Sequence, residues 1–214
     1  MTQRTYDLAG FDAVSLGGPH NVIVSVGPGH SVRAEGPADV LDQLRLEVEN
    51  GSLNIDTDRK KGISFGFGEK NRQKLTIHVT MPAIRGAAIG GSGDIRIDKA
   101  QGARFAATIG GSGDIEIGSI RVEEASFSIA GSGAIRAAGT ATRSEGSVAG
   151  SGDVDVARLE SRTASVSIAG SGDVRARAME TAKVSIVGSG DVSISGPAKC
   201  SVSKMGSGNV SCSG

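Results

Sequence analysis

The chain has 214 residues and no formal net charge, because 23 Lys and Arg balance 23 Asp and Glu. This balance argues against a nucleic-acid-binding protein, which usually presents a strongly basic surface. A hydrophobic content of 38% argues against a disordered chain, and no apolar run reaches the roughly 18 residues of a membrane-spanning helix. With 33 Gly, five Phe, one Tyr and no Trp, the core must consist mainly of Val, Ile and Ala.

The first 83 residues predict short strands at irregular spacing. Apolar and polar residues alternate in segments 11–16, 22–26 and 75–81, as they do in strands with one buried face. Residues 37–43 predict a short helical turn. Segment 44–56 predicts a hairpin, because two alternating runs flank Asn50-Gly51, a pair that favours a type I′ turn.

One segment of this N-terminal part, residues 58–74, differs from its surroundings in composition. It contains six basic and two acidic residues around two of the five Phe. Basic charge beside exposed apolar side chains suits an anionic surface such as lipid headgroups or acidic polysaccharide. The alternative is a long loop whose Phe side chains fold back onto the protein. The candidate interaction residues are Arg59, Lys60, Lys61, Phe65, Phe67, Lys70 and Arg72.

From residue 84 onward the chain repeats itself. Gly-Ser-Gly begins at Gly91, Gly111, Gly131, Gly150, Gly170, Gly188 and Gly206, at intervals of 18 to 20 residues. Apolar residues alternate with polar ones on both sides of each copy, so each repeat holds two short strands joined at a glycine corner whose φ we expect to be positive. A repeat of this size cannot bury its own apolar face and must stack on its neighbours.

The stacked repeats predict an all-β fold, a single-stranded parallel β-helix (solenoid) of about seven regular coils. Columns of Val and Ile point inward, with Lys204 interrupting one of them, and a column of Ser and Thr points outward. Chain chirality favours a right-handed coil. Because no linker separates the two parts, we expect one domain, residues 1–214, with irregular strands over 1–83 and repeat coils over 84–214.

Five residues after each corner begins, the outward residues alternate in sign. They are Arg96, Glu116, Arg136, Asp155 and Arg175. Stacked coils would place these opposite charges side by side. Since an exposed ion pair contributes only about 0–1 kcal/mol, we interpret the alternation as a means of fixing the register between coils.

A column of acidic residues directly follows the corners. Its members are Asp94, Asp114, Asp153, Asp173, Asp191 and Asn209, with Ala134 in one copy. We interpret them as turn residues whose side chains accept hydrogen bonds from nearby backbone N–H groups, a role that Asn fills without charge. The alternatives are a calcium-binding column, a glycosidase carboxylate pair and a surface for a cationic partner. A catalytic pair differs in environment from one carboxylate to the other, whereas these residues are equivalent by position.

No further motif predicts a catalytic residue, a metal site or a cofactor. The three His precede the repeats without metalloprotease spacing, and the Gly-rich corners lack the Lys of a phosphate-binding loop. Cys200 and Cys212 both fall at inward positions of the last coil, where they would form either a disulfide or two buried thiols. A disulfide is favoured if the protein is exported.

Several motifs in a specific order resemble the bacterial head GIN domain family, labelled as auto-transporter adhesins. They are Gly10-Phe11-Asp12-Ala13-Val14, the segment 37–43 followed by 44–55, Val79-Thr80-Met81-Pro82 and the recurrent Gly-Ser-Gly-Asp-Ile. The resemblance spans nearly the whole chain and implies a right-handed β-helix that is exported to the cell envelope. It implies no catalytic residues, because none are assigned in that family.

Taken together, these observations predict a non-enzymatic cell-envelope or secreted β-helix that acts as an adhesin or interaction scaffold. The alternative is a carbohydrate-active or calcium-dependent polysaccharide-binding β-helix. The expected partner is an envelope, glycan or protein ligand, and a homodimer could form through open strand edges. The expected location is periplasmic, outer-membrane-associated or extracellular, with a signal peptide removed before Met1.

Overall fold

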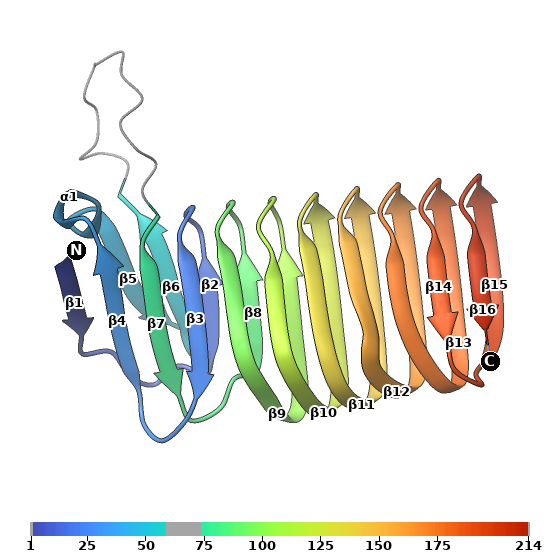
Figure 1. The fold of residues 1–214 in the computed structure, drawn as a ribbon, viewed down its shortest axis with the longest axis horizontal. Helices are drawn as coiled ribbons and strands as arrows, with labels where there is room; N and C mark the ends of the chain where they lie inside the picture. Colours follow the sequence, from blue (N-terminus) through green and yellow to red (C-terminus); the bar gives the residue numbers. More distant parts are fainter. Residues whose placement is uncertain (1, 59–73, 214) are drawn as a thin grey trace, which may run out of the picture.

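The computed structural model describes residues 2–58 and 74–213, and within them the chain forms sixteen strands and one short helix (Figure 1). The elements are β1 (Thr2–Tyr6), β2 (Ala13–Leu16), β3 (Asn21–Val26), β4 (Ser31–Gly36), α1 (Ala38–Leu41), β5 (Leu44–Glu49), β6 (Ser52–Thr57), β7 (Thr76–Met81), β8 (Gly86–Ile89), β9 (Asp94–Ile109), β10 (Ile115–Gly131), β11 (Ala134–Gly150), β12 (Asp153–Gly170), β13 (Val174–Gly188), β14 (Val192–Ser195), β15 (Lys199–Gly206) and β16 (Val210–Ser213).

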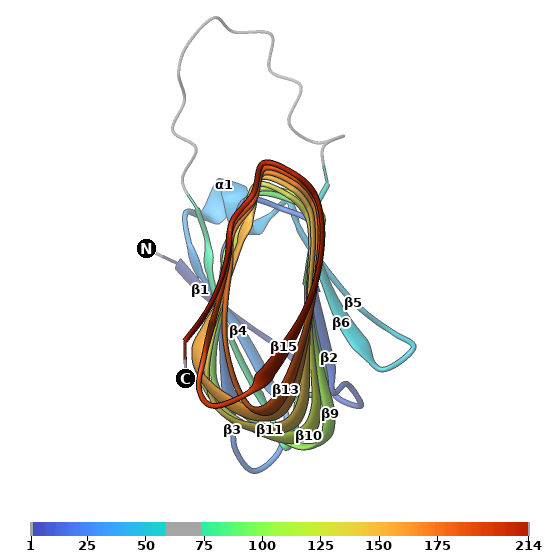
Figure 2. The same cartoon turned by 90° about the vertical axis from the view of Figure 1, so that its right-hand side faces the viewer.

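The repeats stack as parallel coils, which confirms the predicted β-solenoid. Each of β9 to β13 spans 15 to 18 residues, because one strand leaves a corner, bends and climbs to the next corner. The register advances by one repeat, so that Ile115 pairs with Ile95 on one side and Ile135 on the other. Viewed along the stack, the coils superpose as a flattened loop with two long sides (Figure 2).

The N-terminal strands continue the same stack, which the sequence did not predict. Strand β3 pairs in parallel with β9 and with β7, and β2 pairs in parallel with β8 and with β6. The β2–β3 coil therefore lies between the β6–β7 coil and the repeats, although β6 and β7 come after β2 and β3 in the chain (Figure 1). The repeat was hidden because these coils lack Gly-Ser-Gly: His20 and Asn21 occupy the positions of Gly93 and Asp94.

Antiparallel strands end the stack at its N-terminal side. Strand β4 pairs antiparallel with β7, β1 pairs with β4, and β5 pairs with β6. The predicted hairpin is confirmed, with φ of 52° at Asn50 and 76° at Gly51, as is the predicted helical turn, α1. Half-buried apolar residues, among them Tyr6, Leu44 and Leu46, pack on the core at this end.

The core consists of aliphatic columns into which two Phe fit by pairing with small residues. Phe105 lies beside Ala125, and Phe127 lies between Ala107 and Gly146 of the neighbouring coils. Both rings are buried. A large side chain is thus matched by a small one in the adjacent coil, as close packing requires.

The stacking of the coils requires glycine in both columns of the corners, and positive φ is a further reason in the first column. From Gly131 onward the first Gly has positive φ, for example 132° at Gly150 and 140° at Gly170, a region that favours glycine. A Cβ at Gly170 would also collide with the carbonyl oxygen of Gly150 in the preceding coil. The second column does not have positive φ, which corrects the prediction made for both. At Gly172 a Cβ would collide with the carbonyl oxygen of Gly152 in the preceding coil, so glycine is required there by the stacking of one corner on the next.

Candidate functional site

The acidic column after the corners forms a series of hydrogen bonds from coil to coil. The Oδ1 atom of each Asp accepts the backbone N–H of the equivalent residue one coil later. The donor and acceptor pairs are Asp114 to Asp94 (3.2 Å), Ala134 to Asp114 (2.9 Å), Asp173 to Asp153 (3.0 Å), Asp191 to Asp173 (3.0 Å) and Asn209 to Asp191 (2.7 Å). The sequence predicted a backbone N–H as donor, and the structure places that donor in the neighbouring coil.

Ala134 shows what happens when the acceptor is missing. The N–H of Asp153, one coil later, donates instead to the carbonyl oxygen of Gly133, at 3.1 Å. At the N-terminal end of the column, the N–H of Asp94 likewise donates to the carbonyl oxygen of His20, at 3.1 Å. The column therefore tolerates the loss of one side chain, because a backbone carbonyl can accept the same N–H.

The carboxylates of the column face solvent and are partly used in ion pairs. Asp94 lies 3.9 Å from Lys74 Nζ, and Asp114 lies 3.6 Å from Arg136, with side chains 43% and 48% exposed. Among residues 2–58 and 74–213, no three His, Cys, Asp or Glu side chains come together as a possible metal site. Chemically, the column offers one hydrogen-bonded and one outward carboxylate oxygen per coil.

The alternating charged column forms some of the expected ion pairs. Arg96 lies 3.4 Å from Glu116, and Arg175 lies 3.8 Å from Asp155. Arg136 instead pairs with Asp114, two residues from Glu116 in the sequence. On the other long side of the coil, the Glu124 carboxylate forms ion pairs with both Arg104 and Arg143, at 2.8 and 3.1 Å.

His20 fills the corner position that glycine occupies in the repeats. It is 2% exposed, its Nδ1 accepts the N–H of Leu75 at 3.2 Å, and its Nε2 lies 3.1 Å from Thr57 Oγ1. Burial, together with the charge of Lys74, lowers the pKa of His20. The neutral imidazole thus joins the end of β6 to the start of β7.

Two surface cavities lie near the N-terminal coils. One, of about 370 Å³, lies beside the β5–β6 hairpin, which projects away from the stacked coils (Figure 2). Its lining includes Arg45, Glu47 and Asp56, and Arg45 donates to Glu47 at 2.7 Å. The other, of about 410 Å³, includes Arg96 and Glu116 in its lining. Exposed charged side chains line both hollows, so they offer hydrogen bonds without a desolvated centre.

The candidate interaction loop lies outside the described residues. This applies to each predicted member, namely Arg59, Lys60, Lys61, Phe65, Phe67, Lys70 and Arg72. In chain order the segment lies between β6 and β7.

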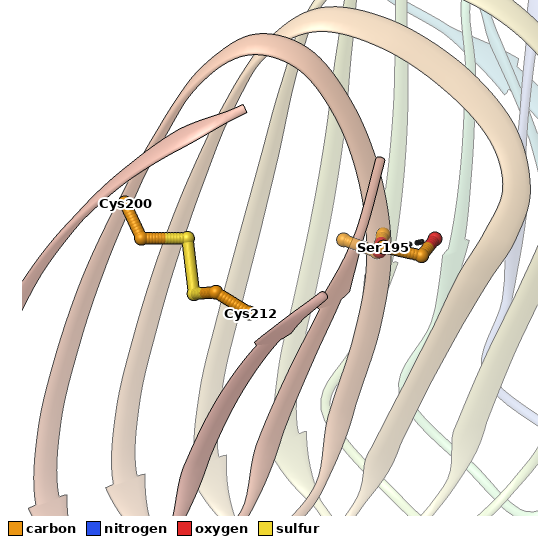
Figure 3. Close-up of a disulfide and its surroundings, with 4 residues drawn as sticks. Ser195, Cys200 and Cys212 are labelled. Atoms are coloured by element: carbon orange, nitrogen blue, oxygen red, sulfur yellow. Dashed lines mark hydrogen bonds between the residues drawn. A yellow bond between two sulfur atoms is a disulfide. The ribbon is translucent and has the colours of Figure 1, made fainter. Parts of the chain in front are cut away.

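Cys200 and Cys212 form a disulfide in the last coil (Figure 3). Cys200 follows the start of β15, and Cys212 precedes the end of β16, so the bond closes the U formed by these strands and their corner. Both positions face inward in earlier coils, where Ala182 and Ile194 are buried. Cys212 is exposed here because no further coil covers it among the described residues.

A column just before each corner went unnoticed in the sequence. Its members grow in size along the stack: Gly90, Gly110, Ala130, Ala149, Ala169, Val187 and Met205. The last two pair directly in register and are 55% and 72% exposed. The signal in the sequence was the replacement of Ala by Val and Met, which interrupts an otherwise small-residue position.

Comparison with sequence families gives a match over most of the chain. Residues 10–198 match the family described as "Putative auto-transporter adhesin, head GIN domain". No curated protein matches the chain. The described residues contain no helix long and apolar enough to cross a membrane.

Solved structures similar to this chain include one from Bacteroides and two from Parabacteroides. A "putative adhesin" from Bacteroides fragilis aligns over 99% of this chain and 96% of its own, with 21% identity and a TM-score of 0.88. A "Putative lipid binding protein" from Parabacteroides distasonis aligns over 99% and 96%, with 26% identity and a TM-score of 0.75. A "putative adhesin" from Parabacteroides merdae aligns over 99% and 95%, with 14% identity and a TM-score of 0.74.

Proposed function

The chain belongs to the head GIN domain family, and on that premise we propose that it is a non-enzymatic, adhesin-like interaction scaffold of the cell envelope or the secreted space. The observation that carries the proposal is the long outward face of β9 to β15. Successive coils there present side chains in straight columns, among them Thr108, Ser128, Ser147, Ser167, Ser185 and Ser203. A rigid, repetitive surface of this kind suits an extended ligand that is bound at many weak contacts.

The environment of the carboxylates supports a binding role over catalysis. The hydrogen-bonded Asp residues share one arrangement, in which Oδ1 accepts an N–H from the next coil and the side chain faces solvent. Acid and base catalysis by two carboxylates needs environments that differ. The alternative, a carbohydrate-active or calcium-dependent polysaccharide-binding β-helix, gains no support from these equivalent carboxylates.

The disulfide supports the export that we propose. Disulfide bonds persist mainly in oxidising compartments such as the periplasm and the extracellular space. The link between Cys200 and Cys212 therefore fits a periplasmic, outer-membrane-associated or extracellular protein better than a cytosolic one. Fractionation of the native host, with an antibody to this chain, tests the proposal: recovery in the cytosol alone would contradict it.

Binding to envelope material tests the function. The purified protein would be incubated with outer-membrane, peptidoglycan and capsule fractions and with arrayed glycans and surface proteins, with heat-unfolded protein as control. We expect saturable binding to at least one component that a chelator does not abolish. Release of sugar fragments would instead identify an enzyme, and binding abolished by a chelator would favour the calcium-dependent alternative.

A second candidate function is lipid binding, which two observations favour. The similar protein from Parabacteroides distasonis is described as lipid binding, at 26% identity over 99% of this chain. Val187 and Met205 expose apolar side chains on the outside of the last coils.

A homodimer through the open edges of β15 and β16 stays a prediction, and size-exclusion chromatography with light scattering tests it.

A further inference from the structure

The large apolar side chains that the described residues expose gather at one end of the stack. They are Val187, Val202 and Met205, with exposed fractions of 55%, 48% and 72%. Val202 faces inward at the open end, whereas Val187 and Met205 lie outward and adjacent on β13 and β15. Exposed apolar side chains that cluster mark a contact surface more often than ones that are scattered singly.

The charged residues beside these apolar side chains are basic. Strand alternation places Thr181, Lys183, Ser185 and Val187 outward on β13, and Lys199, Ser201, Ser203 and Met205 outward on β15. We call these eight residues the C-terminal patch. It contains two Lys and no acidic residue, and the preceding strand, β12, adds Thr163, Ser165, Ser167 and Ala169 without charge. Glu180, just before the patch, is held by Arg162 at 2.8 Å.

The rest of the molecule differs from the C-terminal patch in charge. On the same long side, β10 and β11 carry both signs of charge, Glu124 and Glu145 together with Arg143. On the opposite long side of the last coils, four outward residues are acidic, Asp153, Asp155, Asp173 and Asp191, against two basic ones, Arg175 and Arg177. An anionic surface would therefore attract the patch side of the last coils and repel the other side.

From this arrangement we infer that the C-terminal patch binds an anionic lipid surface, an inference that deepens the second candidate function by naming the contact residues and the charge of the lipid. Lys183 and Lys199 donate hydrogen bonds to headgroup phosphates. Val187 and Met205, at the corner end, enter the boundary between headgroups and acyl chains. This combination of basic and apolar residues is typical of peripheral membrane contact. The acidic side of the coils then faces away from the membrane.

Sedimentation with vesicles tests the inference. The probes are vesicles of phosphatidylcholine alone and of phosphatidylcholine mixed with phosphatidylglycerol, each at low and at physiological salt. Two variants remove the contacts separately: Lys183→Ser with Lys199→Ser, and Val187→Ser with Met205→Ser. The matched control is Arg175→Ser, which removes one positive charge from the opposite side of the same coil. Circular dichroism and the intact disulfide verify that each variant is folded.

We expect the wild-type protein and the Arg175→Ser variant to sediment with the anionic vesicles only, more strongly at low salt. The lysine variant should bind roughly tenfold more weakly, since each Lys near an anionic surface contributes to binding. The apolar variant should also bind more weakly, but with an unchanged salt dependence. If the protein binds lipid and neither variant weakens the binding, the C-terminal patch is not the contact surface, although lipid binding itself would stand.

A second arm separates lipid from other anions. Beads that carry an acidic polysaccharide replace the vesicles, with the same variants. Binding to the beads without binding to anionic vesicles would overturn the lipid surface in favour of a polysaccharide. Absence of vesicle binding by wild-type protein that still binds protein or glycan components of the envelope would refute the lipid inference and leave the adhesin-like function standing.

Discussion

The backbone N–H of Ala134 donates to Asp114 Oδ1 at 2.9 Å, yet Ala134 has no side-chain oxygen to offer the next coil. The acidic column therefore works in one direction, with each carboxylate serving the coil that follows it. Removing one Asp side chain affects only the backbone N–H of the equivalent residue in the next coil. The backbone N–H of the substituted residue keeps its acceptor in the preceding coil. This relationship makes the energetic contribution of each Asp separable from that of its neighbours.

Replacing Asp173 by Ala should lower the free energy of unfolding by no more than about 1 kcal/mol, because the N–H of Asp191 loses the charged acceptor and must bond a backbone carbonyl instead, as the N–H of Asp153 does after Ala134. Asp173→Asn should have a smaller effect, since the amide oxygen can accept the same bond. Urea denaturation measures both changes. Glu116→Ala is the control: its carboxylate pairs with Arg96 at 3.4 Å, and an exposed pair contributes about 0–1 kcal/mol. Equal losses for Asp173→Ala and Asp173→Asn would show that charge matters and the hydrogen bond does not.

Gly172, in a corner, and Gly90, just before one, should respond differently to the same substitution. Gly172→Ala places a Cβ against the carbonyl oxygen of Gly152 and should destabilise by roughly 2 kcal/mol or more. Gly90→Ala meets no atom within 4 Å, so its melting temperature should remain close to that of the wild type. Thermal unfolding followed by circular dichroism compares the two. A tolerated Gly172→Ala would mean that neighbouring corners can move apart.

The sequence predicted the regular coils well, because each column there is set by local spacing and repeated many times. It did not predict the place of β6 and β7 outside β2 and β3, since the partner of a short alternating strand depends on which sheet edge remains free. The antiparallel strand β4 was missed as a cap for the same reason. The donor to each Asp also lay beyond local reasoning, because it belongs to the residue 18 to 20 positions later.

Loss of the disulfide should loosen the last coil and leave the others unchanged. The link spans 12 residues, and a loop of that size corresponds to about 3 kcal/mol in the chain-entropy model. In a Cys200→Ser and Cys212→Ser double variant, we expect faster amide exchange in β15 and β16 but not in β10 to β12. Treatment of the wild type with a reductant should reproduce the effect. Two free thiols found by mass spectrometry in unreduced protein would rule the link out.

Stability should decrease as the pH falls, through His20. Burial lowers the pKa of this residue below its ordinary value of 6.5, so the unfolded chain binds the proton more readily than the folded one. The contribution of the neutral ring is complete above pH 6.5 and is lost progressively below it. Protonation also removes the acceptor for the Leu75 N–H. Urea midpoints measured across this range should depend less steeply on pH in His20→Gln than in the wild type, and an unchanged dependence would exclude this residue.

Lys204 limits how the open end of the solenoid can associate. It takes the position of Ile186 in an inward column, and its Nζ donates to the carbonyl oxygen of Gly208 at 2.8 Å. A charge that points inward at a sheet edge disfavours pairing with another edge, because pairing would bury it. Lys204→Ile should therefore increase end-to-end association, measured as a higher mass by light scattering at equal protein concentration. Lys204→Gln, which keeps a polar group at the edge, should associate less than Lys204→Ile. If Lys204→Ile leaves the mass unchanged, the open edges do not govern association.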